Sequence, residues 1–185
     1  MTNRRLKNGK TVLVGVLAGI AAVLIMSVTA CSFLGTKNEP MPEPQPDMTP
    51  AELAGFYMHY ADEGNVQAQY ELGKMYALGI GVDINYRESA KWFRQSAEKG
   101  HAQAQNSLSY MYANALGVEL DFVESVKWVR KSAEQGFAEA QWRLGMMYEL
   151  GYGVDTNKAE TVKWMKKSAE QGFEPAIDYL NYEME

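Results

Sequence analysis

Cys31 is the only cysteine of this 185-residue chain, and the residues before it indicate the chemistry of its thiol. The first ten residues hold four basic and no acidic residues, and the run 11–30 then carries no charge. Small residues, Val28-Thr29-Ala30, precede the cysteine. A basic start, an apolar stretch and small residues before a boundary are typical of an export signal, so we expect residues 1–30 to be a signal peptide. A retained transmembrane helix is the alternative, because the uncharged run is about long enough to span a bilayer.

The segment Val28-Thr29-Ala30-Cys31 resembles the lipobox of bacterial lipoproteins, although that motif usually begins with leucine. The resemblance implies that Cys31 becomes the mature N-terminus and carries acyl chains, which anchor a protein far better than one chain could. Ser32, at a position where aspartate tends to imply inner-membrane retention, implies an outer-membrane lipoprotein that faces the periplasm. Anchoring to the inner membrane is the alternative. Because its only cysteine is acylated, such a chain forms no internal disulfide and no cysteine-based metal site.

The other reactive residue types do not form a catalytic arrangement in the sequence. His59 and His101 are the only histidines, and His59 lacks the i+4 partner of a helical metal site, so both are interpreted as surface or boundary residues. No nucleophile elbow, Walker loop or dinucleotide-binding loop is present. The segment Gly79-Ile80-Gly81 recurs in register along the chain and therefore reflects repeat geometry. We expect a protein that is not an enzyme and needs no cofactor and no metal.

The residues that follow the predicted signal peptide are characterised by an acidic net charge and by a proline-rich segment. The chain has 18 basic and 23 acidic residues, and the first ten residues take four of the basic ones, which leaves 14 against 23 and a net charge of −9. This balance weighs against a nucleic-acid partner. Between residues 40 and 46 every second residue is proline, which favours an extended chain. We predict that residues 31–48, which begin with the lipidated cysteine, form a flexible linker; a proline-motif ligand is the alternative.

The rest of the chain is repetitive. Segments 65–100 and 101–136 match at 18 of 36 positions, and segments 101–136 and 137–172 also match at 18 of 36. Four glycines spaced by 36 residues close Ala-x-x-Gly segments, namely Gly64, Gly100, Gly136 and Gly172. We therefore predict three repeats. Residues 49–64 align with the second half of a repeat and residues 173–185 with the first half, so both ends are expected to be capping helices.

Each repeat is predicted to form two antiparallel helices. In the first helix, Ala68, Leu72 and Tyr76 recur at i, i+4 and i+8, which places them on one face, and glycine ends the helix. The second helix begins at a polar cap such as Asn85, and Glu88 three residues later is expected to reach back to it. One column of the second helices is predicted to be buried and holds Trp92, Trp128 and Trp164. The predicted fold is an all-α solenoid of helix pairs.

These residues resemble the Sel-one-like repeat family, relatives of the tetratricopeptide repeats. The resemblance covers about residues 50–185 and is carried in the first repeat by Ala68, Leu72, Gly73, Tyr76, Gly79, Gly81, Val82, Ala90, Trp92, Phe93, Ala97 and Gly100. Departures from the family pattern are Ser109, Ala115 and Val126 in the second repeat, and serine in place of alanine at Ser96, Ser132 and Ser168. The resemblance implies a right-handed superhelix and a role as an adaptor or binding module, without indicating the partner.

Binding surfaces are expected where the repeats differ, because the shared positions are committed to packing. The variable positions of the first helices fall at i, i+4 and i+7, which is a second face, and this face is predicted to line the concave groove. The predicted contact residues are Tyr70, Lys74, Asn106, Tyr110, Glu139, Trp142, Met146, Glu149, Asp178 and Tyr182. Burial in the core is the alternative for the aromatic members, but a core column would stay apolar in every repeat.

Trp142 is predicted to be the aromatic anchor of the groove, flanked by Tyr110 and Tyr182. Acidic residues surround it in the C-terminal half, which predicts a protein partner with a basic contact patch. The second helices carry a basic column, interpreted as a solvated outer face with Arg94–Glu98 and Arg130–Glu134 pairs at i+4. Contact of this column with anionic lipid or an acidic partner is the alternative.

Two classes of function follow from these predictions. The first is a periplasm-facing binding protein that grips a protein in its groove, either as an immunity protein against a secreted, lipase-like toxin or as a general envelope scaffold. The second is a hydrolase of lactam-type substrates, which some cysteine-rich relatives of the family are described to be. The sequence argues against the second class, because it has no serine or histidine arrangement for acyl transfer.

Overall fold

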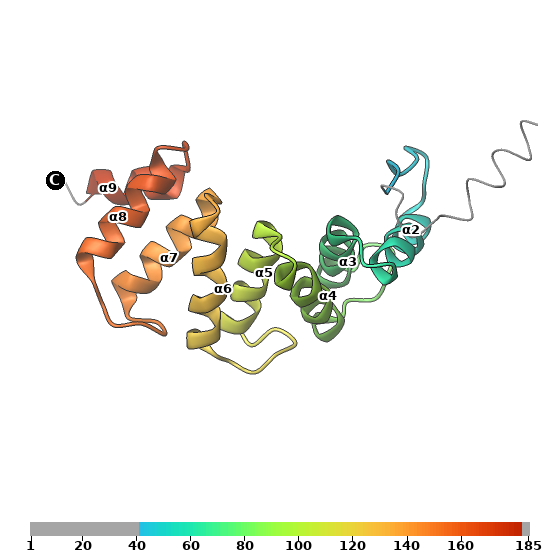
Figure 1. Ribbon diagram of the computed structural model, residues 1–185, viewed down its shortest axis with the longest axis horizontal. Coiled ribbons are helices and arrows are strands. Elements are labelled where there is room, and N and C mark those ends of the chain that lie inside the picture. Colours follow the sequence, from blue (N-terminus) through green and yellow to red (C-terminus); the bar gives the residue numbers. More distant parts are fainter. Residues whose placement is uncertain (1–40, 183–185) are drawn as a thin grey trace, which may run out of the picture. The chain divides into compact units, whose positions relative to one another are not determined.

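The computed structural model describes residues 41–182, and all its regular elements are helices. Figure 1 shows them in chain order: α2 (Pro50–Asp62), α3 (Val66–Leu78), α4 (Tyr86–Glu98), α5 (Ala102–Ala113), α6 (Phe122–Glu134), α7 (Ala138–Leu150), α8 (Lys158–Ala169) and α9 (Glu174–Tyr182). Each helix packs against the next one along the chain, and the repeats are α3–α4, α5–α6 and α7–α8. The prediction of an all-α solenoid of antiparallel helix pairs is confirmed. Within residues 41–182, no helix is both long and apolar enough to cross a bilayer.

The predicted signal peptide, Cys31 and residues 32–40 lie outside the described residues, as do residues 183–185 of the predicted C-terminal capping helix. The end of the predicted linker, however, is described. Met41 is half-buried and packs against the apolar cluster that contains Ala61, Leu72 and Trp92. Because α2 is the second helix of a repeat without its first helix, its apolar side needs other cover. Met41 supplies part of it, so this end of the linker belongs to the folded domain.

The helix N-termini follow the expected caps, with one correction. The side chains of Asn85, Asp121 and Asn157 accept hydrogen bonds from the first backbone amides of α4, α6 and α8. The expected return contact from the glutamate is formed only before α2, where Glu52 accepts from the Thr49 amide at 2.8 Å. In the three repeats the corresponding glutamates are ion-paired with a lysine three residues later: Glu88 with Lys91, Glu124 with Lys127 and Glu160 with Lys163. The next turn of the helix thus offers these carboxylates a better partner.

A buried column of glutamines joins each repeat to the one before it, and the apolar pattern of the sequence gave no sign of it. The side-chain amides of Gln69, Gln105 and Gln141 donate to backbone carbonyls of the preceding helix at 3.0–3.1 Å. These carbonyls belong to the last turn of a helix and also accept hydrogen bonds from the backbone amides of Gly64, Gly100 and Gly136 at 3.0 Å. The glutamines therefore add a second hydrogen bond at each of these helix ends and join it to the following repeat.

The serines that depart from the family pattern have a similar structural role. The hydroxyls of Ser96, Ser132 and Ser168 donate to the carbonyl oxygens of Val66, Ala102 and Ala138 at 2.7–2.8 Å. All three serines are buried, and each bond runs from the second helix of a repeat to the start of its first helix. An alanine would leave these carbonyls without this donor. The serines thus fix the two helices of each repeat against each other.

The second glycine of each interhelical loop marks the closest contact between repeats. A Cβ atom at Gly81, Gly117 or Gly153 would lie 1.9–2.2 Å from a backbone carbonyl oxygen at the start of the preceding second helix. These glycines also have φ between 69° and 71°, which side-chain-bearing residues rarely adopt. Only glycine therefore lets the loop of one repeat lie against the previous repeat.

Candidate functional site

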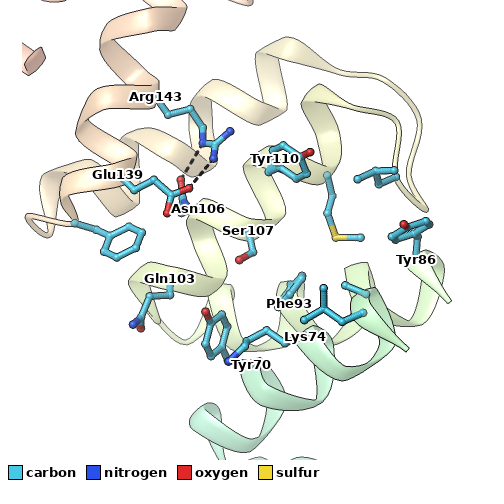
Figure 2. Close-up of a pocket in the computed structure, with 15 residues that line it drawn as sticks. Tyr70, Lys74, Tyr86, Phe93, Gln103, Asn106, Ser107, Tyr110, Glu139 and Arg143 are labelled. Carbon is cyan, nitrogen blue, oxygen red and sulfur yellow. Dashed lines mark hydrogen bonds and ion pairs between the residues drawn. The ribbon is translucent and has the colours of Figure 1, made fainter. Parts of the chain in front are cut away.

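A pocket of about 460 Å³ opens between α3, α4, α5 and α7. Figure 2 shows its lining, which consists of Tyr70, Lys74, Ala77, Leu78, Tyr86, Phe93, Gln103, Asn106, Ser107, Tyr110, Met111, Leu116, Phe137, Glu139 and Arg143. Five of the ten contact residues predicted from the sequence are among them: Tyr70, Lys74, Asn106, Tyr110 and Glu139. The variable face of α3 and α5 therefore lines one concavity, whose volume lies in the range typical of ligand-binding clefts.

One wall of the pocket is aromatic. Tyr70 stacks on His101 with a ring separation of 4.7 Å and also approaches Phe93 at 5.8 Å. Phe93 is buried and forms the floor between α3 and α5, whereas Tyr110 on α5 is 46% exposed. Stacked rings lose little conformational freedom when a partner binds, so such a wall is suited to an apolar side chain.

His101 holds Tyr70 in place because both of its ring nitrogens have partners. Its Nδ1 accepts a hydrogen bond from the Ala104 amide at 3.2 Å, and its Nε2 lies 3.0 Å from the Oε1 of Gln67. This arrangement requires a neutral ring with the proton on Nε2. Burial of the ring lowers the His101 pKa below its ordinary value, and the nearby Glu71 charge opposes this only partly. His101 is thus the N-cap of α5 and a structural residue of the pocket.

The two cations of the pocket are both compensated by carboxylates. Lys74 donates to Glu71 at 2.7 Å and lies 5.3 Å from the centre of the Tyr70 ring. Burial lowers the Lys74 pKa, but the hydrogen bond with Glu71 and the charge of Glu71 outweigh burial, so the net effect is a raised pKa. On the opposite side, Arg143 donates to Glu139 at 2.8 Å. The pocket therefore has polar edges but no uncompensated charge on either side.

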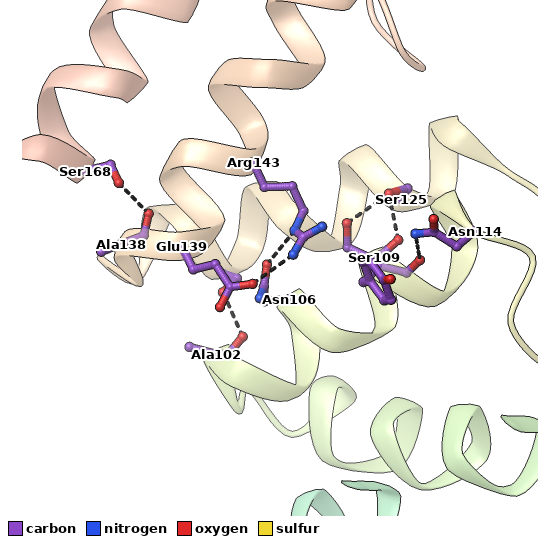
Figure 3. A network of polar contacts seen from close by, with 11 residues as sticks. Ala102, Asn106, Ser109, Asn114, Ser125, Ala138, Glu139, Arg143 and Ser168 are labelled. Atoms are coloured by element: carbon purple, nitrogen blue, oxygen red, sulfur yellow. Dashed lines mark hydrogen bonds and ion pairs between the residues drawn. The ribbon is translucent and has the colours of Figure 1, made fainter. Parts of the chain in front are cut away.

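Arg143 is the residue of this site that sequence reasoning missed. Its Nε donates to the Oδ1 of Asn106 at 3.1 Å, and its guanidinium lies 5.2 Å from the Tyr110 ring centre. Figure 3 shows that Arg143 joins Glu139 on its own helix to Asn106 on the neighbouring first helix. A signal was present in the sequence, because position 143 corresponds to Glu71 and Ser107 in the other repeats and varies as much as the predicted groove positions do.

The other five predicted contact residues lie outside this pocket. Trp142 is half-buried and its ring lies 5.8 Å from that of Phe173. Met146 is half-buried, whereas Asp178 and Tyr182 are exposed. Glu149 is paired with Lys158 at 3.3 Å, and its pKa is lowered, first by the hydrogen bond from Tyr179. Tyr110, which was expected beside Trp142, has its ring centre 5.2 Å from the guanidinium of the adjacent residue Arg143. The predicted acidic character of this half is reduced, because Glu139 and Glu149 both have cationic partners.

The arginines in the basic column of the second helices have other hydrogen-bond partners than those predicted. Arg94 and Arg130 donate to the hydroxyls of Tyr112 and Tyr148 at 2.7 and 2.8 Å, where pairs with Glu98 and Glu134 were expected. These tyrosines belong to the first helix of the following repeat, so the arginines link neighbouring repeats. Lysines of the column lie over the tryptophan rings, as Lys131 does at 4.2 Å from the Trp128 ring centre. The column therefore contributes to stacking of the repeats as well as to the outer surface.

Comparison with known proteins identifies the family. The Sel1 repeat model matches residues 66–101, 102–137 and 138–173, more than half of the chain. The chain belongs to the Sel1 repeat family. Solenoids of Sel1 repeats are scaffolds for protein–protein interaction. None of the curated proteins matches the chain. Within residues 41–182, no cluster of His, Cys, Asp and Glu has the arrangement of a metal site.

Three solved structures resemble this Sel1 repeat protein. A protective antigen of uropathogenic Escherichia coli strains, with an SLR fold, shares 37% identity over 71% of this chain with a TM-score of 0.69. The match covers only 28% of that antigen. A Sel1 repeat protein from Oxalobacter formigenes shares 39% identity, covering 68% of this chain and 94% of that one, with a TM-score of 0.63. Cysteine rich protein B of Helicobacter pylori shares 22% identity over 71% of this chain and 97% of its own, with a TM-score of 0.58, which indicates the common fold alone.

Proposed function

We propose that this Sel1 repeat protein is a non-catalytic binding protein, anchored by acylated Cys31 to the periplasmic face of the outer membrane, that holds a partner protein at the α3–α5–α7 pocket. The observation that supports this most directly is the pocket itself. Tyr70, Phe93 and Tyr110 present aromatic surface on rigid helices, and polar groups surround them. Aromatic anchors within a polar rim are the common composition of interface hot spots.

The envelope location is proposed from the predicted signal and Cys31, with anchoring to the inner membrane as the alternative. The Escherichia coli relative is a protective antigen, and an envelope location of this chain would agree with that. An immunity protein is the most specific form of the proposal, because a toxin delivered into the periplasm would meet a binding protein there. The net charge of −9 beyond the signal favours a toxin with a basic contact patch.

A general envelope scaffold is the second candidate, and a separate surface favours it. Beyond the pocket, large exposed apolar side chains gather in and beside the loops that join the helices of each repeat, namely Ile80, Ile84, Leu120, Val123, Leu150 and Tyr152. A scaffold that binds several proteins needs more than one such surface. A gene for a lipase-like toxin next to this one would favour the immunity protein, and envelope-assembly genes would favour the scaffold.

Photo-crosslinking in living cells tests the proposed binding site. A photoreactive amino acid at Ser107, which lines the pocket, is expected to capture a discrete protein, because a bound partner must cover this position. The matched control is the same amino acid at the exposed Lys127 of α6, which lies outside the pocket lining. Equal capture from both positions, or capture from Lys127 alone, would contradict the proposed site.

The anchor is tested separately by Cys31→Ser. We expect this variant to leave the membrane fraction or to stay unprocessed, and to lose incorporation of a fatty-acid probe. Serine lacks the thiol that lipid transfer uses, while the remaining signal is unchanged. Incorporation of the probe that survives the substitution would show that Cys31 is not the lipidated residue.

A further inference from the structure

The basic residues of this protein are concentrated on the second helices of the repeats. Of the 14 basic residues that follow the predicted signal, ten lie in α4, α6 and α8, which hold only five acidic residues. These three helices therefore carry a net charge of +5, whereas the rest of the chain beyond the signal, with four basic and 18 acidic residues, carries −14. A surface whose charge opposes that of the whole protein is suited to an anionic partner, because the remaining surface repels such a partner.

Three exposed lysines of these helices have no carboxylate partner. They are Lys131 on α6 and Lys166 and Lys167 on α8, and we call them the lysine patch. One lysine in each second helix is, by contrast, ion-paired with the glutamate three residues before it. Within residues 41–182, no carboxylate lies within ion-pair distance of a patch lysine. The charge of the patch is therefore not neutralised by a direct contact and is available to a partner.

Two tryptophans restrict the lysines of the patch. The Nζ of Lys131 lies 4.2 Å from the Trp128 ring centre, and that of Lys167 lies 4.5 Å from the Trp164 ring centre. A lysine that already lies over a ring loses less conformational freedom when it binds. The equivalent position of the first repeat is Gln95, so the patch is confined to the second and third repeats.

We propose that the lysine patch binds the anionic headgroups of the membrane to which Cys31 is anchored, so that α6 and α8 lie along the bilayer surface. This inference rests on the proposed anchor and goes beyond the proposed function, because it assigns a lipid contact to the folded domain itself. None of the residues that line the pocket comes from α6 or α8. The pocket therefore stays open to a partner protein while the patch is bound.

The residue types of the patch favour lipid over an acidic protein. Lysine is depleted in protein interfaces, where arginine and exposed aromatic residues are enriched. The arginines of the second helices are engaged elsewhere, since Arg94 and Arg130 donate to the hydroxyls of Tyr112 and Tyr148. No large hydrophobic side chain of α8 is exposed, and Val123 in the first turn is the only one of α6. An ammonium group attracts a mobile phosphate without fixed geometry, so lysines without an apolar centre suit headgroups.

The length of chain before the folded domain keeps the patch near the membrane. Met41 packs on the domain, and it follows Cys31 by ten residues. Ten residues span at most about 35 Å when fully extended. A surface tethered so closely meets the bilayer at a high effective concentration, so a modest attraction is sufficient to bind it. Each lysine near an anionic surface favours binding about fivefold.

Energy transfer in proteoliposomes tests the proposal. The full-length acylated protein carries Glu134→Cys at an exposed position of α6, and since lipid blocks Cys31, only the new thiol takes the donor fluorophore. The acceptor is a headgroup-labelled lipid in vesicles of phosphatidylcholine, with or without phosphatidylglycerol. We expect phosphatidylglycerol to raise the transfer and high salt to reverse the rise, because salt screens the attraction. Equal transfer in the two kinds of vesicle would overturn the proposal.

Substitutions test the lysines themselves. Replacing all three patch lysines by glutamine should weaken the membrane-bound arrangement about a hundredfold, since each contributes about fivefold. Replacing them by arginine keeps the charge and should keep the transfer. Asn181→Asp, at the exposed end of α9, changes the net charge away from the patch and should behave like the wild type. A glutamine variant that keeps its melting temperature and shows the transfer of the wild type would refute the role of the patch.

Separate outcomes identify a failure of the proposed function. Wild-type protein that takes up the fluorophore would have a free Cys31 thiol, which refutes the proposed acylation; the lysine substitutions leave Cys31 unchanged and still decide the patch. Capture at Ser107 that fails while phosphatidylglycerol raises the transfer refutes the pocket and supports the lipid contact. If phosphatidylglycerol has no effect and the glutamine variant instead loses capture at Ser107, the patch binds an acidic protein and the lipid contact is refuted.

Discussion

In the first and third repeats a glycine of the first helix lies against a large side chain of the second, whereas the middle repeat changes both members of this pair. A Cβ atom at Gly73 would lie 2.6 Å from the Phe93 ring, and one at Gly145 would lie 3.0 Å from Met165. The middle repeat has Ser109 at the first position and the smaller Val129 at the second. The reduced volume of valine leaves space for a serine, so the two positions are matched in size.

The middle repeat uses this space for a polar contact. Ser109 and Ser125 are both buried, and their hydroxyls lie 2.9 Å apart (Figure 3). The same repeat has Ala115 with φ of 54° where the others have glycine, and Asn106 where they have aromatic residues. Among these departures of the middle repeat, Asn106 lines the pocket, whereas Ser109, Ala115 and Val129 lie outside its lining. The comparison teaches that a departure at one position of a repeat is matched by a second change at the side chain that it contacts, as Ser109 and Val129 are.

The tryptophan column gives the largest expected difference between the repeats. The sequence places the three tryptophans in one column, but the structure buries them to different extents: Trp92 and Trp164 are 6% and 5% exposed, whereas Trp128 is half-buried. We expect Trp164→Ala to cost about 3–5 kcal/mol of unfolding free energy and Trp128→Ala about 2 kcal/mol, because less apolar surface is lost. Urea denaturation of the two variants measures the difference. Equal losses would show that the middle repeat is packed as tightly as the third.

The contact between Gly73 and Phe93 gives the next largest expected loss of stability. We expect Gly73→Ser to cost about 1–3 kcal/mol, because its Cβ atom would overlap the Phe93 ring. Adding Phe93→Val should recover part of this loss, since the pair then reproduces Ser109 and Val129 of the middle repeat. A double-mutant cycle of thermal unfolding measures the coupling. Additive losses in the double variant would argue that the two positions are not matched in size.

Substitution of Ala115 is expected to change the stability less, and to increase it. Its left-handed φ of 54° costs alanine about 1 kcal/mol relative to glycine, which occurs at the equivalent positions Gly79 and Gly151. We therefore expect Ala115→Gly to stabilise the protein by somewhat less than about 1 kcal/mol, since glycine loses more chain entropy on folding. Differential scanning calorimetry measures the change. The control is Gly79→Ala, which should destabilise; a loss of stability in both variants would refute the strain at Ala115.

The cap of α5 predicts the smallest effect, a dependence of stability on pH. Because burial lowers the folded-state pKa of His101 below its unfolded value of about 6.5, the unfolded chain binds the proton more readily. The neutral His101 ring contributes fully to the free energy of unfolding when the pH is above the His101 pKa of the unfolded chain. This contribution is lost as the pH falls through the His101 pKa of the folded protein. His101→Asn, which copies the Asn65 cap of α3, should remove this part of the pH dependence. Identical pH profiles of the two proteins by denaturant unfolding would disprove it.

Most of the fold could be predicted from the sequence, because the features that define it are local and recur with the repeat. The period of 36 residues, the apolar faces and the polar caps follow from spacing alone, and they placed the helices of all three repeats. The variable face of the first helices also followed from spacing, and it includes five residues of the pocket. Repetition makes such inferences robust, since each position is observed several times in equivalent surroundings.

Only the tertiary structure decided which part of the groove forms the pocket. Arg143 and Asn106 are 37 residues apart and occupy non-equivalent positions, so no periodic pattern connects them. The same holds for Met41, which covers α2 where a helix of the repeat is missing, and for Trp142, which packs on Phe173 outside the pocket. The repeat period determines which side chains share a face. Which of them meet depends on side-chain size and direction across neighbouring repeats, and that is a property of packing in three dimensions.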